Sequence, residues 1–414
     1  MSNKKIWLVR TGEILPIDEQ FPRLFRMGLI AQICSANPDN EVTWWCSTYN
    51  HFKKEFRYNS DKIVDMSDQY RLYLIHSGGY KKNMSFKRLY HQLHEGRRFI
   101  KLAEKEDKPD FILCSMPTPE ILFYVTKYAR KHNIPVYADI RDTFPDMYVD
   151  FCADKLKPFM KIGIIPYQHM LSAGLKRCTG ICATSEKFLE WGLHYAKREK
   201  TEMDRAFYVS YPDNNAVELS DSDIEYWYGL GVKEDDFVCC FFGQFGFTVD
   251  LETVMRASLL TAKENPKIKF VICGVGEKIT EYKKIISNAD NVIFPGWVDR
   301  VKICSLGKIA QVGLLSYRPG DNYRNSMPNK FCEYLSLGIV CLIQPEGMMK
   351  QLAEQRNCGI HYADENELSK YLLKLAENRG LTDTMKRNAR QLYEEKFCAE
   401  KVYSEMVAFL IKNT

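Results

Sequence analysis

Short apolar runs alternate almost regularly with helical patterns along this chain of 414 residues. In the first half the apolar runs are residues 6–9, 42–46, 72–76, 111–115, 136–140 and 180–184. Helix periodicity fills the spaces between them, for example in residues 23–34, 119–131 and 185–195. Strands that alternate with helices in this way predict a parallel sheet with helices on both faces.

The alternation stops once and then restarts. Residues 211–236 form a polar, acidic segment, after which strand-like runs resume at 237–242, 269–273, 291–294, 312–316 and 339–343. We therefore predict an α/β fold with two Rossmann-like domains facing a cleft, because ligands of such sheets bind beyond the carboxyl ends of the strands. The expected parts are an N-terminal domain (1–210), a linker (211–236), a C-terminal domain (237–390) and a C-terminal helix (391–414) that could pack back on the N-terminal domain.

The composition is that of a soluble globular protein, with 45% apolar and 27% charged residues. The first apolar run, 6–9, is too short for a signal peptide, and the longest uncharged stretch, 162–175, is too short and too polar to span a membrane. The 14 cysteines include no C-x-x-C pair, which indicates buried thiols in a reducing compartment. We expect a cytoplasmic protein without disulfides or a zinc site.

Positive charge is concentrated in the N-terminal half, above all in residues 80–105. In this segment Phe86, Leu89, Leu93, Ile100 and Leu102 interleave with Lys and Arg. Such a helix can pack its apolar stripe on the domain core and leave its basic face in solvent, or it can lie on an anionic membrane surface. We expect the stripe to join the core, and the membrane interpretation stays open for the basic face.

The stretch "SMPNKFCEYLSLGIVCLI", residues 326–343, is mostly apolar but contains one carboxylate, Glu333. Pro328 suits the first turn of a helix, and Gly338 supplies a left-handed stop. A helix that starts with Lys330 and no acidic residue offers free N–H groups to a phosphate. Glu333, one turn further on, is then either a surface residue or a ligand for a hydroxyl next to that phosphate.

Glycine-containing loops follow the strand-like runs of the second half. They read "GQFGF" after residue 242, "GVGE" after 273, "PGWV" after 294 and "YRPGDNYRNSMP" after 316. Glycine lets the backbone approach a ligand closely, although any single glycine is also a common turn residue. Four such loops on successive strands, beside the helix just described, predict a ligand site at this edge of the second sheet.

These segments resemble a known family. "MPNKFCEYLSLG" is similar to the donor-binding segment of the retaining glycosyltransferases of family 4, which have the two-Rossmann GT-B fold. Residues 270–317 have the family's succession of elements. The N-terminal half resembles the bacterial surface-polysaccharide branch through "WLVRTGEILPID", "EVTWWCSTYNHFKKEFR" and "VYADIRDTFPD". The resemblance therefore covers nearly the whole chain.

The resemblance implies a nucleotide-sugar donor, with no metal and no separate cofactor. The family carries two Glu residues separated by seven others, and the second, which falls on Glu333, commonly binds the ribose hydroxyls. The start of the helix would hold the phosphates. The implied donor-binding residues are Gly243, Gly246, Gly274, Gly276, Trp297, Val298, Arg324, Ser326, Met327, Asn329, Lys330 and Glu333.

The sequence departs from the family pattern at three places. Asn325 occupies the first Glu position and would orient the sugar without a charge. The basic pair that follows the family's first C-terminal strand has no counterpart in "GQFGFTVD", so that Arg318, Arg324 or Lys330 would have to supply the charge. Many members place a His after the strand at 136–140, whereas this chain has Arg141 and Asp142, as its branch often does. We expect Arg141, Asp142 and Asn325 to act at the reacting centre.

The implied function is transfer of a sugar, with retention, to a lipid-linked or oligosaccharide acceptor in O-antigen, capsule or other exopolysaccharide synthesis, by a cytoplasmic enzyme at or near an anionic membrane surface. A non-catalytic scaffold relative and a sugar-nucleotide epimerase of the same fold remain alternatives, since fold alone does not separate them. Asp221 and Asp223 spell an Asp-x-Asp motif, but they lie in the polar segment and not at a strand end. No nucleic-acid-binding module is present, so we expect no nucleic-acid partner.

Overall fold

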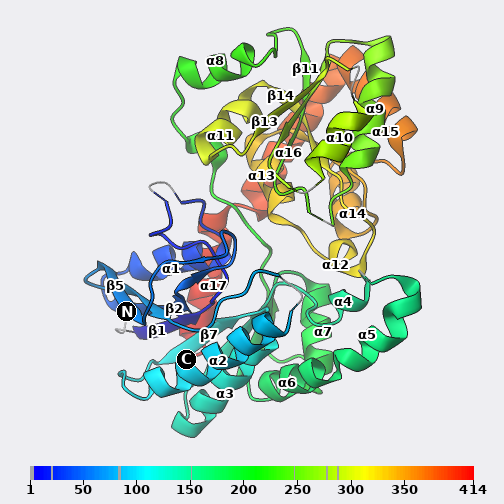
Figure 1. Ribbon diagram of the computed structural model, residues 1–414. Coiled ribbons are helices and arrows are strands. Elements are labelled where there is room, and N and C mark those ends of the chain that lie inside the picture. Colours follow the sequence, from blue (N-terminus) through cyan, green and yellow to red (C-terminus); the bar gives the residue numbers. More distant parts are fainter. Residues whose placement is uncertain are drawn as a thin grey trace. The chain divides into compact units, whose positions relative to one another are not determined.

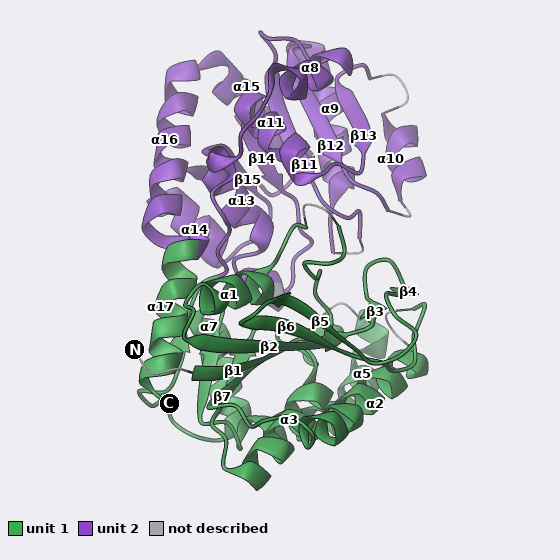
Figure 2. Ribbon diagram, turned by 90° about the vertical axis from the view of Figure 1, so that its left-hand side faces the viewer, with its two compact units in different colours: residues 1–208, 400–414 green, residues 209–399 purple. Residues whose placement is uncertain are grey.

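The computed structural model describes residues 4–19, 22–82, 85–150, 152–246, 248–276, 278–286 and 289–414 (Figure 1). The chain divides into two compact units. Unit 1 comprises residues 1–208 and 400–414, and unit 2 comprises residues 209–399 (Figure 2). Each unit is a sheet with helices on both faces, and the prediction of two successive α/β units is confirmed.

Unit 1 contains an eight-stranded sheet in the order β10-β9-β8-β7-β1-β2-β6-β5. Its strands are β1 (Lys4–Val9), β2 (Asn40–Ser47), β5 (Lys62–Ser67), β6 (Tyr70–Ile75), β7 (Phe111–Ser115), β8 (Val136–Ile140), β9 (Gly180–Ala183) and β10 (Arg205–Ala206). Among these strands every pair is parallel except β5 with β6, which is antiparallel. The alternation did not predict β5, because its side chains are mostly exposed and form no apolar run.

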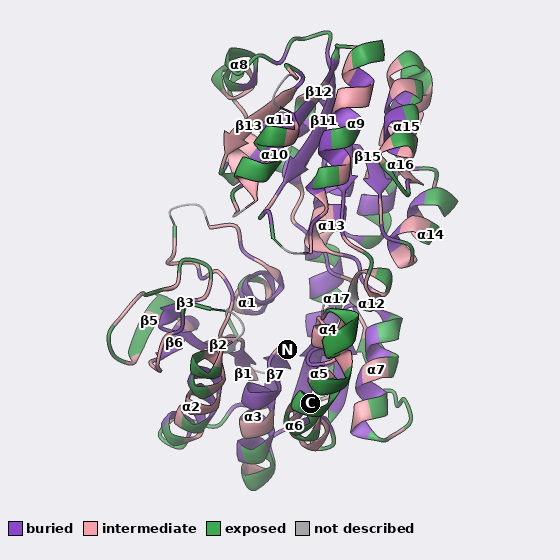
Figure 3. Cartoon of the chain, turned by 45° about the vertical axis from the view of Figure 1, so that its right-hand side comes forward, coloured by how far each residue is buried: buried purple, intermediate pink, exposed green. Residues whose placement is uncertain are grey.

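The helices of unit 1 are α1 (Arg26–Ser35), α2 (Phe86–Ala103), α3 (Pro119–His132), α4 (Met147–Asp150), α5 (Lys157–Gly163), α6 (Ile165–Leu175), α7 (Glu186–Ala196) and most of α17 (Ala399–Lys412). Short strands β3 (Tyr49–Asn50) and β4 (Glu55–Phe56) form a separate hairpin. The core is aromatic at its centre, where Trp45 stacks on Tyr73 at 4.2 Å and meets Trp7 edge to face at 4.9 Å. Figure 3 shows buried residues in most strands, with β5 as an exposed exception in this unit, and exposed residues on the outer faces of the covering helices.

A buried ion pair ties the last helix to unit 1. The side chains of Arg26 in α1 and Asp139 in β8 are both 0% exposed, and their atoms approach to 2.9 Å. Arg26 also donates to the carbonyls of Phe207 and Tyr208 at 3.0 and 3.1 Å, and its guanidinium lies 5.2 Å from the ring centre of Tyr403 in α17. Burial alone would lower the pKa of Arg26, but the charge of Asp139 outweighs it and raises the pKa.

Unit 2 contains a six-stranded sheet in the order β13-β12-β11-β14-β15-β16, and all its paired strands are parallel in the described part of the chain. Its strands are β11 (Phe237–Phe242), β12 (Ile268–Cys273), β13 (Val292–Gly296), β14 (Ala310–Leu315), β15 (Val340–Ile343) and β16 (Gly359–His361). Its helices are α8 (Asp221–Gly229), α9 (Leu251–Glu264), α10 (Ile279–Ile285), α11 (Arg300–Ile309), α12 (Asp321–Arg324), α13 (Asn329–Leu337), α14 (Met348–Gln355), α15 (Glu365–Glu377) and α16 (Arg379–Lys396).

The segment 211–236, which we expected to be a linker, lies in unit 2 and includes α8. Its anchor is Trp227, which is 0% exposed and whose Nε1 donates to Ser305 Oγ of α11 at 2.8 Å. At the other end of unit 2, residues 391–399 stay with this unit, and only residues 400–414 belong to unit 1. The segment we expected to form a separate C-terminal helix is therefore divided between α16 and α17.

All 14 cysteines lie in described segments and are free thiols, and twelve of them are buried. Burial raises the pKa of Cys34 to about 12, so that this thiol stays protonated and unreactive at neutral pH. In the described residues, no helix is both long enough and apolar enough to cross a membrane.

Candidate functional site

The order in which strands are added to the sheet of unit 2 reverses between β11 and β14. Counted along the chain, its strands follow the order 3-2-1-4-5-6, and β11 and β14 are the central neighbours. In open α/β sheets of this kind, ligands bind outside the carboxyl ends of the strands at such a topological switch point. The loops that lie there are residues 243–250 after β11 and residues 316–328 after β14. These are two of the loops that the sequence singled out.

The two loops are bound to each other along their backbones. Arg318 N donates to Thr248 O, and Asp250 N donates to Ser316 O, both at 2.9 Å. Tyr323 adds a hydrogen bond from its hydroxyl to Thr248 Oγ1 at 3.0 Å. A loop pair joined in this way presents a defined backbone surface at the switch point.

Two of the glycines keep the neighbouring loops in close backbone contact. Gly243 and Gly274 have φ values of +150° and +141°, which favour glycine strongly. A Cβ on Gly274 would lie 1.8 Å from Gly243 O, and a Cβ on Gly276 would lie 2.6 Å from Phe245 O. Gly246 is different, because a Cβ there would meet nothing within 4 Å. The loops after β11 and β12 therefore pack backbone to backbone at this edge, which side chains would prevent.

Helix α13 starts at the same edge. Pro328 is its N-cap, with φ −67° and ψ 155°, so the helix begins one residue later than a proline in the first turn would place it. The described residues of its first turn include no acidic side chain. The Lys330 ammonium lies 3.6 Å from the ring centre of Phe241 in β11 and 5.2 Å from that of Tyr317 after β14. A Cβ on Gly243 would lie 3.1 Å from Lys330 Nζ, so the cation sits at the switch point.

Glu333 lies one turn inside α13 and is 1% exposed. It is therefore not a solvated surface residue, which excludes one of the two interpretations of its place in the sequence. A ribose would reach this carboxylate only if ligand binding uncovered it. Its role as the ribose ligand stays a prediction.

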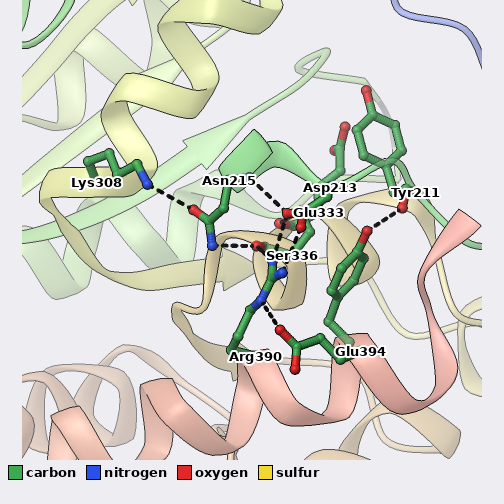
Figure 4. Close-up of polar contacts among 9 residues, drawn as sticks. Tyr211, Asp213, Asn215, Lys308, Glu333, Ser336, Arg390 and Glu394 are labelled. Carbon is green, nitrogen blue, oxygen red and sulfur yellow. Dashed lines mark hydrogen bonds and ion pairs between the residues drawn. The ribbon is translucent and has the colours of Figure 1, made fainter. Parts of the chain in front are cut away.

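The far end of α13 is fixed by a polar network (Figure 4). Gly338 ends the helix with φ +65°, as expected. Arg390 of α16 donates to Ser336 O at 2.8 Å and pairs with both oxygens of Asp213 at 2.7 and 2.6 Å. Asn215 donates to the same Ser336 carbonyl at 3.2 Å. Two of these bonds satisfy the Ser336 carbonyl, one of those that a helix end leaves open, and so they hold the helix that carries Lys330 and Glu333.

The remaining predicted donor residues lie around this edge in different environments. Trp297 is 58% exposed, whereas Val298, Ser326 and Met327 are buried. Arg324 is exposed, and Asn325 and Asn329 are half-buried. A Cβ on Gly347 would lie 2.1 Å from Arg324 O, so the start of α14 packs directly on the loop that carries Arg324.

Unit 1 has its own switch point, between β1 and β7. A cavity of about 260 Å³ opens at this carboxyl edge. Loops after β1, β2, β6, β7 and β8 line it together with one face of α2. The lining residues are Arg10, Thr11, Gly12, Tyr49, His51, Phe52, Tyr80, Arg88, His91, Gln92, Glu95, Pro117, Thr118 and Asp142. Asp142 is the only one of them that we had predicted to be a site residue, and Arg141 next to it pairs with the buried Glu13 instead.

A histidine and a carboxylate of α2 lie next to each other in this cavity. His91 Nδ1 faces Ser77 Oγ at 2.6 Å and the Gly78 carbonyl, which only accepts, so Nδ1 carries a hydrogen. His91 Nε2 lies 3.4 Å from Glu95 Oε1. Burial raises the pKa of Glu95. Such a pair can both donate to and accept from a sugar hydroxyl.

Basic side chains cluster around Tyr80 at another part of the wall. His51 Nδ1 meets the Tyr80 hydroxyl at 2.5 Å, and the charges of Lys54 and Arg88 lie 4.8 and 5.7 Å from the Tyr80 ring centre. Burial, followed by the charges of Lys54 and Arg88, lowers the pKa of His51 to about 3. Burial and Arg88 lower the pKa of Lys54 to about 8. Burial and Arg141 lower the pKa of Arg10 to about 10.

The cavity changes the interpretation of the basic segment 80–105. Our expectation that its apolar stripe joins the core is wrong for Phe86, which is 91% exposed, although Leu102 is buried. In the first half of α2 the buried side chains are His91, Gln92 and Glu95, which face the cavity. A polar buried face of this kind looks like a solvated face in the sequence, because its burial depends on loops far away along the chain.

The Asp-x-Asp motif has a structural explanation. Asp223 closes a capping box at the start of α8, where it accepts hydrogen bonds from Ser220 N and Oγ at 3.0 and 2.6 Å. It also pairs with Lys302 at 2.9 Å. These hydrogen bonds, the one from Ser220 Oγ foremost, lower the pKa of Asp223 to about 2. Within the described segments, no group of three or more His, Cys, Asp and Glu side chains could hold a metal ion.

Comparisons with known proteins point to one class of enzyme. Residues 229–392, all in unit 2, match the model of the family described as Glycosyl transferases group 1. An uncharacterized glycosyltransferase of Methanocaldococcus jannaschii is 26% identical over 172 residues, which are 40% of this chain and 43% of that protein. Alpha-monoglucosyldiacylglycerol synthase of Acholeplasma laidlawii is 22% identical over 181 residues, which are 42% of this chain and 43% of that protein. The match thus spans less than half of each curated relative.

Solved structures match over almost the whole chain. HepE of Anabaena, in complex with UDP and glucose, has a TM-score of 0.67 and 14% identity, and the match covers 98% of this chain and 99% of HepE. Sucrose-phosphate synthase of Thermosynechococcus elongatus has a TM-score of 0.74 and 13% identity, with 99% and 98% covered. Identities this low establish the fold alone. Residues 229–392 thus match the family model of the glycosyl transferases group 1, and the chain has the fold of the GT-B glycosyltransferases among its structural neighbours.

Proposed function

We propose that this protein transfers a sugar from a nucleotide-sugar, held by unit 2, to a hydroxyl of an acceptor held by unit 1. The observation that carries the proposal is the position of Lys330 and the start of α13 at the switch point between β11 and β14, inside the segment that matches the family model. Free N–H groups, the helix dipole and a cation together suit a diphosphate. Structures of HepE with UDP and with UDP-glucose support a donor of this chemical class.

Each step of the transfer has a candidate residue in this chain. The N–H groups at the start of α13 and the Lys330 ammonium would stabilise the negative charge that develops on the leaving diphosphate. Glu333 would accept the ribose hydroxyls, and Asn325 would orient the sugar. In the acceptor cavity, Asp142 would orient the hydroxyl that attacks. The departing phosphate would take the proton of that hydroxyl, so the reaction needs no protein nucleophile.

The finer assignment is to the retaining family 4 and to synthesis of a bacterial O-antigen, capsule or other exopolysaccharide on a lipid-linked or oligosaccharide acceptor. The resemblance of the N-terminal half and the curated relative named for an alpha-glucosylated lipid support it. Proton NMR of the product tests retention. An inverted anomer, together with an inactive Asp142→Asn variant, would instead make Asp142 the general base of an inverting enzyme.

We also propose that the transfer needs no divalent metal. The helix start and Lys330 would neutralise the diphosphate in place of a metal, and Asp223 is engaged in the cap of α8. Activity in EDTA should equal activity in buffer alone. Loss of activity in EDTA and its recovery with Mn²⁺ would contradict the proposal.

Association with the cytoplasmic face of an anionic membrane is a further proposal. Two exposed segments of unit 1 combine lysines with apolar side chains. One carries Lys81, Lys82, Phe86 and Lys87 at the start of α2, and the other carries Lys155, Leu156, Phe159, Lys161 and Ile162 in and before α5. Each lysine near an anionic surface contributes about 1 kcal/mol, and salt screens the effect. Arg88 is not part of this surface, because it lines the cavity.

Co-sedimentation with phosphatidylserine vesicles at low salt tests the association. The Lys81/Lys82/Lys87→Ala and Phe159/Ile162→Ser variants should each pellet less than the parent protein. Neutral vesicles are the control. Equal pelleting of all three proteins would show that neither segment binds the membrane.

A screen for slow hydrolysis of nucleotide-sugars by the purified chain tests the proposed enzyme. We expect one donor to be hydrolysed above background, and Lys330→Gln to abolish that hydrolysis. A non-catalytic scaffold is the second candidate, because Asn325 replaces a Glu and the basic pair is missing. Nucleotide binding without hydrolysis or transfer of any donor would favour the scaffold. Conversion of one nucleotide-sugar into another would favour an epimerase.

A further inference from the structure

The cavity of unit 1 has two chemically different parts. One part carries carboxylates and an amide, from Glu95, Asp142 and Gln92. The other part is lined by Arg10, His51 and Arg88, and Lys54 lies next to His51 and over the ring of Tyr80. We call these four basic side chains the cationic wall. Carboxylates and amides suit sugar hydroxyls, whereas a cationic wall suits an anion.

The cationic wall holds its charges at short range, and its four side chains are half-buried. Lys54 Nζ lies 3.4 Å from His51 Nδ1, and both Lys54 and Arg88 lie over the Tyr80 ring. The main charge effects on His51 come from Lys54, Arg88, Arg10 and His91, which all carry or can take positive charge. These charges lower the pKa of His51. Burial and the charge of Arg88 likewise lower the pKa of Lys54. Like charges gathered in this way destabilise one another, and an anion placed between them removes the repulsion.

The cavity has room for a small ligand. Its volume of about 260 Å³, just below the ~300–1,000 Å³ of pockets for drug-sized ligands, is enough for one compact polar group beside a sugar ring. Tyr49, Phe52 and Tyr80 supply flat apolar surface for such a ring.

We propose that the cationic wall binds a phosphate group of the acceptor, while Asp142, Gln92 and Glu95 contact the hydroxyls of the sugar that carries it. The acceptor is then a phosphorylated sugar, either a soluble phosphate ester or a sugar joined to a lipid through phosphate. The inference rests on the proposed function only in that it calls the bound molecule the acceptor. The anion site itself does not depend on the proposed function.

Binding of phosphate is measured on the full chain by calorimetry with glucose 1-phosphate, in the presence of saturating UDP to occupy unit 2. Arg88→Gln and Lys54→Gln should each weaken binding about tenfold, the scale of one charge-assisted hydrogen bond. Lys101→Gln, an exposed change on the same helix as Arg88, is the matched control and should leave binding unchanged. Equal affinity of all four proteins, or no binding to the parent, would overturn the proposal.

NMR titration of His51 provides a readout that loss of folding would not imitate. Bound phosphate should raise the pKa of His51 from about 3 toward its ordinary value, because a nearby anion favours the imidazolium. The same titration in Arg88→Gln should show a higher starting pKa and a smaller change on adding glucose 1-phosphate. An unchanged His51 signal at saturating glucose 1-phosphate would contradict binding at this wall.

Transfer assays separate the two sources of the phosphate. The acceptors compared are glucose, glucose 1-phosphate and glucose linked through diphosphate to a short polyprenyl chain. At least one of the two phosphorylated acceptors should have a KM at least tenfold below that of glucose, and the Arg88→Gln substitution should remove this difference. The better phosphorylated acceptor identifies the source, and equal KM values for all three would overturn the proposal.

These experiments test the anion site separately from the proposed function. Lys330→Gln should abolish nucleotide binding and hydrolysis but leave glucose 1-phosphate binding in unit 1 intact. If no nucleotide-sugar were bound or hydrolysed while Arg88→Gln still weakened phosphate binding, the anion site would stand and the proposed function would fail.

Discussion

The two units present the same kind of sheet edge in different ways. At the switch point of unit 2, the backbones of Gly243 and Gly274 are in close contact, and the cation of Lys330 lies beside them. At the switch point of unit 1 the surface is mainly charged and titratable side chains, such as Arg10, Arg88, His91 and Glu95. A backbone edge suits a group common to many ligands, such as a diphosphate, and a side-chain edge can be specific for one acceptor.

The difference extends to what holds each unit together. Unit 1 relies on a buried ion pair, Arg26 with Asp139, at the centre of its packing. At the switch point of unit 2, glycines let the loops meet without side chains. Substitution of Asp139 should therefore damage unit 1 through unpaired charge, and substitution of Gly274 should damage the edge of unit 2 through steric overlap.

The largest effect is expected from Asp139→Asn. It leaves the Arg26 guanidinium buried and without its carboxylate, and loss of one partner of a buried pair destabilises a protein by about 3–5 kcal/mol. Chemical denaturation followed by fluorescence measures the change. Because Arg26 also contacts Tyr403, limited proteolysis should release α17 first. A loss below about 1 kcal/mol, the scale of an exposed pair, would show that unit 1 does not depend on this pair.

Gly274→Ala should follow, with a loss of about 1–3 kcal/mol from the φ of +141° alone and more from the overlap with Gly243 O. Nucleotide binding should fall with it, since the edge of unit 2 is distorted. Gly246→Ala is the matched control, because a Cβ there meets nothing within 4 Å. Equal thermal stability of the two variants would contradict the packing of these loops.

Glu333→Ala should weaken nucleotide binding by roughly 1–3 kcal/mol, the scale of hydrogen bonds to a charged group. Glucose 1-phosphate binding in unit 1 should stay as it was. Calorimetric titration with UDP measures nucleotide binding, and calorimetric titration with glucose 1-phosphate measures binding in unit 1. Unchanged UDP affinity in a folded Glu333→Ala protein would remove this residue from the donor site.

The smallest effect concerns pH and His51. Its pKa is about 3 in the folded chain and about 6.5 unfolded, so the unfolded state binds more protons as the pH falls below 6.5. The stability due to neutral His51 is thus fully present above pH 6.5 and is lost as the pH falls toward 3. Between pH 7.5 and 5.5 the loss amounts to about 1.4 kcal/mol. His51→Gln should lack this part of the slope.

His194→Gln, at an exposed histidine of α7, is the control for that measurement and should keep the slope of the parent protein. Glucose 1-phosphate should also reduce the slope of the parent, since it stabilises the imidazolium form of His51. Identical slopes for the parent and His51→Gln would show that His51 is not held neutral by the cationic wall.

The sequence predicts the edge of unit 2 better than that of unit 1 for a physical reason. Glycine after a strand, a proline before a helix and Lys330 in its first turn are local signals, and each lies within a few residues of the position it determines. The cavity of unit 1 is built from residues as distant as Arg10, Tyr80 and Asp142, which only the fold brings together. The apolar pattern of α2 was misleading because its cavity face is polar.

Two further features were not predicted from the sequence, for related reasons. β5 has exposed side chains and is antiparallel, so it shows neither an apolar run nor the expected direction. The segment 211–236 is polar except at a few positions, and one tryptophan, Trp227, is enough to anchor it to α11. In both cases the tertiary contact, and not the local pattern, decides the structure.

The most direct test of this account is a crystal structure of the full chain with the nucleotide that the hydrolysis screen identifies. We predict that the diphosphate lies at the switch point between β11 and β14, within about 3 Å of backbone N–H groups at the start of α13 and of Lys330 Nζ. The cavity of unit 1 should hold no nucleotide. A diphosphate bound to Arg10 and Arg88 in unit 1, with the glycine edge of unit 2 empty, would contradict the assignment of the two edges.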